Sequence, residues 1–166
     1  SLEPALEYIQ DDEILEVTKR PEREVNAGFW DFAQGYAKLR AGELDFARLY
    51  LSRVKQTEAT SKQSFRGHPA KTLLGVASGI LEGEILRTIG DKKGALAAFE
   101  RAVKADDEIE YDEPEPLNFD ARHWLGAMQL DAGMAAEAEA TYRTELKEHA
   151  HNGWSLLGLQ QALKAQ

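Results

Sequence analysis

The side chains best suited to metal or acid–base chemistry in this sequence are its four histidines, His68, His123, His149 and His151. His149 follows Glu145 by four residues, so the two side chains share one face of a helix. Together with His151 they offer the nitrogen and carboxylate ligands that a zinc ion takes. The helix is expected to end near Ala150, which turns His151 away, and a histidine at a helix C-terminus also suits the helix dipole. We therefore expect no metal site at this position.

Carboxylates form two further candidate groups. Glu82 and Glu84 are two residues apart and lie on different sides of a helix, which places them poorly for shared acid–base work. Seven carboxylates lie between Asp106 and Glu115, but they lack the Asp-x-Asp-x-Asp-Gly spacing of a calcium loop. The prolines of this stretch, Pro114 and Pro116, favour a stiff, exposed linker.

Motifs that carry enzyme chemistry are missing. The sequence has no glycine-rich phosphate loop, no Gly-x-Ser-x-Gly, no His-Glu-x-x-His and no cysteine. We therefore predict a binding protein without a cofactor, not an enzyme. The remaining enzyme or metal hypothesis places Glu84, Arg122 and His123 together on neighbouring helices.

Charge and hydropathy exclude other classes of partner. The net charge of −9 disfavours nucleic acid and acidic membrane surfaces. No stretch approaches the roughly 20 apolar residues that a membrane helix needs, and no secretory signal is visible at the N-terminus. We expect a cytoplasmic protein.

A repeated spacing organises the chain. Each copy has a glycine at a turn, a second glycine seven residues earlier, an alanine five residues later and a large side chain nine residues later. The turn glycines are Gly42, Gly90 and Gly133; the earlier glycines are Gly35, Gly83 and Gly126; the alanines are Ala47, Ala95 and Ala138; the large residues are Leu51, Phe99 and Tyr142. Small residues let two antiparallel helices cross closely, and the turn glycine supplies the left-handed conformation that ends the first helix.

This pattern resembles the tetratricopeptide repeat, a helix–turn–helix unit of about 34 residues. Trp154, Leu157 and Gly158 match the consensus at the start of a fourth unit. The resemblance implies an all-α fold of antiparallel helix pairs stacked as a right-handed α-solenoid of about three and a half repeats. We expect helices at about 26–40, 43–58, 70–89, 91–105, 117–131, 135–149 and 152–165, with Asp91 and Asn118 as caps.

The repeat is irregular, because extra residues lie between units around 58–71 and 106–116. Residues 65–166 also resemble a bacterial subgroup of uncharacterised tetratricopeptide proteins, through Phe65–Lys71, Glu82–Glu84, Tyr111–Pro114 and His151–Trp154. Its members are usually longer, so we expect a fragment or a short relative. We predict a cover segment at 1–25 and one helical repeat domain at 26–166.

The resemblance implies a concave groove, lined by the first helix of each unit, that binds a protein or peptide. Alignment places these residues in the groove: Phe29, Phe32, Tyr36, Ile80, Glu84, Arg87, Asp120, His123 and Asn152. Phe29, Phe32 and Tyr36 have two interpretations: binding anchors, or a core covered by residues 1–25. The alternative function is self-association as a homodimer through the last helix, which would expose Trp154, Leu157 and Leu163.

Overall fold

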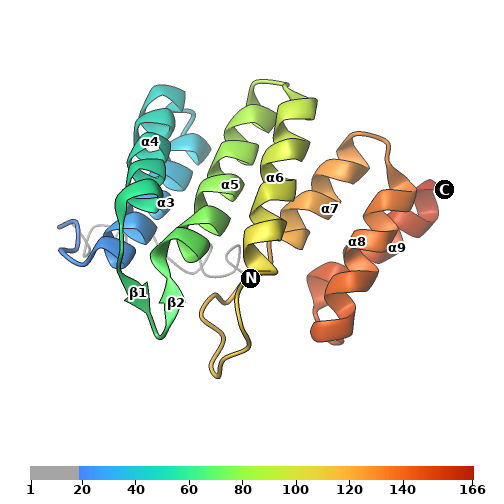
Figure 1. The fold of residues 1–166 in the computed structure, drawn as a ribbon. Helices are drawn as coiled ribbons and strands as arrows, with labels where there is room; N and C mark the ends of the chain where they lie inside the picture. Colours follow the sequence, from blue (N-terminus) through green and yellow to red (C-terminus); the bar gives the residue numbers. More distant parts are fainter. Residues whose placement is uncertain (1–18) are drawn as a thin grey trace.

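The computed structural model describes residues 19–166 and is all-helical in that range, with 71% of it in helices. Seven α-helices follow one another along the described chain (Figure 1). They are α3 (Glu24–Arg40), α4 (Leu44–Thr60), α5 (Ala70–Thr88), α6 (Lys92–Asp106), α7 (Arg122–Asp131), α8 (Ala135–Glu148) and α9 (Gly153–Ala165). None of them is long and apolar enough to cross a membrane.

Helices α3 and α4, α5 and α6, and α7 and α8 form three hairpins, and α9 packs against α8 and α7 (Figure 1). The turn of each hairpin contains the expected glycine in a left-handed conformation, with φ of 78° at Gly42, 83° at Gly90 and 77° at Gly133. The residue after each glycine donates its N–H to a carbonyl five residues back, over 2.9, 2.9 and 2.8 Å. This is the Schellman motif, repeated three times.

The close helix crossings depend on the earlier glycines. A Cβ added at Gly83 would overlap the ring of Phe99, and one added at Gly126 would overlap the ring of Tyr142. The first hairpin differs, because a Cβ at Gly35 would meet Leu81 and Tyr50 instead of Leu51. The expected pairing of glycine with a large residue nine positions beyond the turn therefore holds in the second and third hairpins only.

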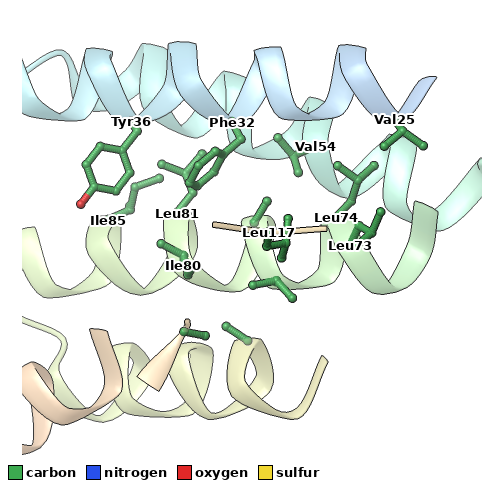
Figure 2. Packing of buried hydrophobic residues seen from close by; sticks show 14 of the residues in the cluster. Val25, Phe32, Tyr36, Val54, Leu73, Leu74, Ile80, Leu81, Ile85 and Leu117 are labelled. Atoms are coloured by element: carbon green, nitrogen blue, oxygen red, sulfur yellow. The ribbon is translucent and has the colours of Figure 1, made fainter. Parts of the chain in front are cut away.

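The main core lies between α3 and α5 (Figure 2). Phe32 and Tyr36 from α3 and Val54 from α4 face Leu74, Leu81 and their neighbours on α5. Helix α5 is buried along most of its length because α3 and α4 pack on one side of it and α6 on the other. The second hairpin thus forms the centre of the molecule.

Two segments between hairpins differ from expectation. The stretch after α4 contains a β-hairpin of two strands, β1 (Ser64–Phe65) and β2 (His68–Pro69), each two residues long. Arg66 and Gly67 form its turn, both at positive φ. Helix α7 begins at Arg122, five residues later than expected, and Asn118 does not cap it. Residues 117–121 instead form a turn that Asp106 holds, because its Oδ2 accepts a hydrogen bond from the N–H of Ala121 over 2.8 Å.

The expected cover segment lies mostly outside the described residues. Helix α3 begins at Glu24, so the last two residues of that segment belong to the helical domain. Just before α3, the Arg20 guanidinium binds both oxygens of Asp31, whose side chain is fully buried, with a closest distance of 2.7 Å. This ion pair fixes the chain that enters α3.

Candidate functional site

A pocket of about 310 Å³ opens between α3, α5, α7 and α9. Four of the residues expected in the groove line it: Tyr36, Glu84, Arg87 and His123. Its other lining residues are Arg40, Trp124, Ala127, Tyr142, Trp154, Leu157, Gly158 and Gln161. The first helix of every hairpin and the final helix α9 therefore contribute side chains to one cavity.

Other expected groove residues are core residues. Ile80 is fully buried and Phe32 is only 3% exposed, so the expectation that they line an open surface is wrong. The reason is that α5 is enclosed by α3 and α4 on one side and by α6 on the other, and both side chains belong to the resulting core. Phe29 is half-buried against the same core, and Tyr36, although it lines the pocket, is 5% exposed. Of the two interpretations of these aromatics, the structure favours core over exposed anchors.

The cover of this core comes partly from a segment that the sequence did not indicate. Phe119, in the turn before α7, stacks on Phe32 with ring centroids 6.5 Å apart. Trp124 lies edge-on to Phe119 at 5.7 Å. Residues 1–25 were expected to provide this cover, but most of them lie outside the described range.

Arg87 places a fixed positive charge at the pocket. It forms an ion pair with Asp131 and lies 3.5 Å from Glu84 Oε1. Burial acts to lower the pKa of Arg87, but the two carboxylates outweigh it and hold the pKa above its ordinary value. Arg40 adds an exposed cation, and among the described residues it has no ion-pair partner.

His123 and Asn152 connect the pocket to a buried polar cluster. The amide nitrogen of Asn152 lies 3.0 Å from His123 Nε2 and donates to Glu145 Oε1 over 3.1 Å. The Asn152 oxygen also caps α9 by accepting from the N–H of Trp154. Burial lowers the pKa of His123, against the opposing effect of the Glu145 and Asp120 carboxylates. Asn152 and Asp120 therefore belong to this cluster and do not line the pocket.

A larger cavity, of about 680 Å³, lies under the acidic segment between α6 and α7. The segment was expected to be a stiff, exposed linker; most of its residues are exposed, and Arg66 holds it. The Arg66 guanidinium donates to the carbonyls of Pro114 and Glu113 and pairs with Asp112 at 2.7 Å. The cavity is lined by Asp106, Asp107, Ile109, Glu110, Tyr111, Asp112, Glu115, Pro116, Leu117, Phe119, Asp120, Arg122, Glu148 and His149.

The remaining enzyme hypothesis is not supported by the positions of its residues. Glu84 and His123 line the pocket, but Arg122 lines the larger cavity and pairs with Asp107 at 2.7 Å. The three side chains therefore do not converge on one cavity.

Comparison with known proteins adds no relative. No family model, no curated protein and no solved structure matches the chain.

Proposed function

We propose that this chain is a protein- or peptide-binding scaffold of the tetratricopeptide type, a right-handed α-solenoid of about three and a half units. One observation carries the proposal: all of the pocket's lining residues except Tyr142 of α8 lie on the first helix of a hairpin or on α9. Those are the elements that line the concave surface in that family. The three identical glycine turns and the two glycine–aromatic crossings support the same interpretation.

The pocket suits a short segment with one apolar side chain beside a carboxylate. Its volume is at the lower end of the range for ligand pockets, about 300–1,000 Å³, so it takes little more than one large side chain. Trp154 and Leu157, each 45% exposed, offer apolar contact. Arg40 is the exposed cation that a carboxylate of the partner would meet.

Two pocket variants test this proposal. Arg40→Glu reverses the exposed charge, and Gln161→Trp fills the pocket from an exposed position on α9. Lys104→Glu is the matched control, because it makes the same change in charge on exposed α6, outside the pocket. The binding of partners captured by the full chain is then measured by fluorescence anisotropy. We expect both pocket variants to bind at least about tenfold more weakly; equal binding by all variants would exclude the pocket as the site.

Self-association is a second candidate, supported by the outer face of α9. Leu156 and Leu163, seven residues apart on one face of α9, are 48% and 49% exposed, whereas the exposed Trp154 and Leu157 line the pocket. Exposed apolar side chains gathered on one face commonly mark a protein–protein contact, so this face of α9 fits a second copy of the chain. Light scattering over a range of concentrations tests it: a dimer that Leu163→Glu dissociates supports the idea, and a strict monomer excludes it.

A further inference from the structure

Three potential metal ligands from distant parts of the sequence meet where α8 ends. They are Asp120 in the turn before α7, Glu145 on α8 and His149 just after α8. One ligand atom from each residue lies within 4.8 Å of the other two. A carboxylate pair with an imidazole is a donor set that zinc and similar divalent transition metals bind.

A buried oxygen of Glu145 without a hydrogen-bond partner is independent evidence for a bound ligand. The Glu145 side chain is only 1% exposed, yet its Oε2 has no hydrogen-bond partner among the described residues. An unsatisfied carboxylate oxygen in the interior is costly, because burial removes water without replacing it. Its other oxygen already accepts from Asn152. Oε1 is the oxygen that faces His149, so a cation that the carboxylate binds through both oxygens would satisfy Oε2.

His149 is oriented as metal-binding histidines usually are. Its Nε2 lies 3.0 Å from Glu115 Oε1, the kind of carboxylate contact that fixes the tautomer and orientation of a ligand histidine. Its Nδ1 lies 3.0 Å from Glu145 Oε1 but forms no hydrogen bond there. Two ligands of a tetrahedral zinc ion, each about 2.0–2.1 Å from the metal, are about 3.3 Å apart. The observed spacing is thus close to that of two ligands of one ion.

Two cationic or potentially cationic groups border the cluster. His123 Nε2 lies 3.6 Å from Glu145 Oε1, but the Asn152 amide nitrogen lies 3.0 Å from the same ring nitrogen, so His123 is not counted among the ligands. Arg122 is the competing charge, but its Nη1 is 3.7 Å from Asp120 while its Nη2 pairs with Asp107 at 2.7 Å. Asp120 and His149 also line the 680 Å³ cavity, which gives an ion a path from solvent.

We propose that Asp120, Glu145 and His149 bind one divalent transition metal ion of the zinc class. The ion would link the end of α8 to the turn before α7. His151, the third ligand that sequence spacing offers, is exposed on the turn after α8 and lies outside the cluster. This inference does not depend on peptide binding in the pocket.

Calorimetric titration of zinc chloride into the full chain, stripped with EDTA and desalted, tests the proposal. We expect one ion per chain and a rise in Tm with added zinc. Glu145→Gln and His149→Ala should each weaken binding at least about tenfold, whereas the control His151→Ala should bind as the parent does. Cobalt should give the absorption bands of a four-coordinate ion.

Three results would overturn the proposal. They are an absence of binding heat and Tm shift in the parent, unchanged affinity in both ligand variants, or loss of binding in His151→Ala equal to that in His149→Ala. Circular dichroism without metal confirms that each variant is folded. Asp120→Asn, which keeps the shape of a buried residue, provides a third ligand test if either other variant fails to fold.

Discussion

Trp124 donates a hydrogen bond from its indole Nε1 to the phenol oxygen of Tyr36 over 3.3 Å, although 88 residues separate them. The bond joins α7 to α3, so the first and third hairpins contact each other beside α5. Both residues also line the pocket. The width of the pocket therefore depends on this contact.

Replacing Tyr36 with Phe should destabilise the protein by about 1 kcal/mol, because a half-buried indole N–H loses its acceptor. Urea unfolding followed by circular dichroism measures this change. Tyr111→Phe is the control, since Tyr111 is 82% exposed and its loss of a hydroxyl should cost almost nothing. Equal stability of the Tyr36 variant and its parent would show that the bond contributes nothing.

Gly83→Ala should destabilise the second hairpin by about 1–3 kcal/mol through overpacking. The added methyl would overlap the ring of Phe99, which is fully buried and has no space to move into. Gly153→Ala, at the start of α9, is the matched control because no atom lies within 4 Å of its added Cβ. We expect the control to be neutral or slightly stabilising, since alanine favours helix over glycine. Thermal unfolding of both variants compares them directly.

The hairpin turns could be predicted because their determinants are local. Gly90 ends its helix through its own backbone conformation and through carbonyls in the preceding turn, and Asp91 caps α6 as expected by accepting from the N–H of Gly94. Ile80 was predicted to line the groove, but it is buried. The apolar pattern of α5 already indicated this burial. Leu74, Ile80 and Leu86 point to three different sides of α5, and a helix that is apolar on all sides is buried.

The polar cluster could not be predicted in full from sequence. Glu145 and His149 are one helical turn apart, so their spacing indicated a shared face. Asp120 lies 25 residues before Glu145, and only the packing of α8 against the turn before α7 brings them together. The late start of α7 also depends on Asp106, whose contact with Ala121 crosses 15 residues of irregular chain.

Asn152 should contribute through two separable interactions. Its oxygen caps α9, while its amide nitrogen donates to buried Glu145. Asn152→Ser keeps a cap and loses the donor, whereas Asn152→Ala loses both. In EDTA, we expect the alanine variant to lose about 2–3 kcal/mol of unfolding free energy. The serine variant should lose about 1 kcal/mol less than the alanine variant does.

Asp91→Ala, which removes the cap of α6, gives the reference for a cap alone, about 1 kcal/mol. Chemical denaturation of all three variants supplies the comparison. If Asn152→Ala costs no more than Asp91→Ala, the contact with Glu145 contributes no stability.

Asp106 should make the protein less stable as the pH rises. Burial is the main cause that raises its pKa from 3.8 to about 7, with Asp120 and Asp107 adding to the rise and the Ala121 N–H and Arg122 opposing it. Below pH 3.8 the carboxyl is protonated in both folded and unfolded chains. Between that value and about pH 7 the unfolded chain ionises first, so stability falls with pH, and above pH 7 the loss is complete.

Asp106→Asn removes this dependence, because an amide stays neutral and its oxygen still accepts from Ala121. We compare the free energy of unfolding of the variant with that of the parent. We expect the variant's advantage to grow by up to about 3 kcal/mol from pH 5 to pH 8. Urea unfolding in EDTA at both pH values measures the gain. Asp45→Asn is the control, since the Asp45 side chain is 99% exposed and its substitution should leave the pH dependence unchanged. A difference between Asp106→Asn and parent that stays constant from pH 5 to pH 8 would mean that Asp106 ionises at its ordinary pKa.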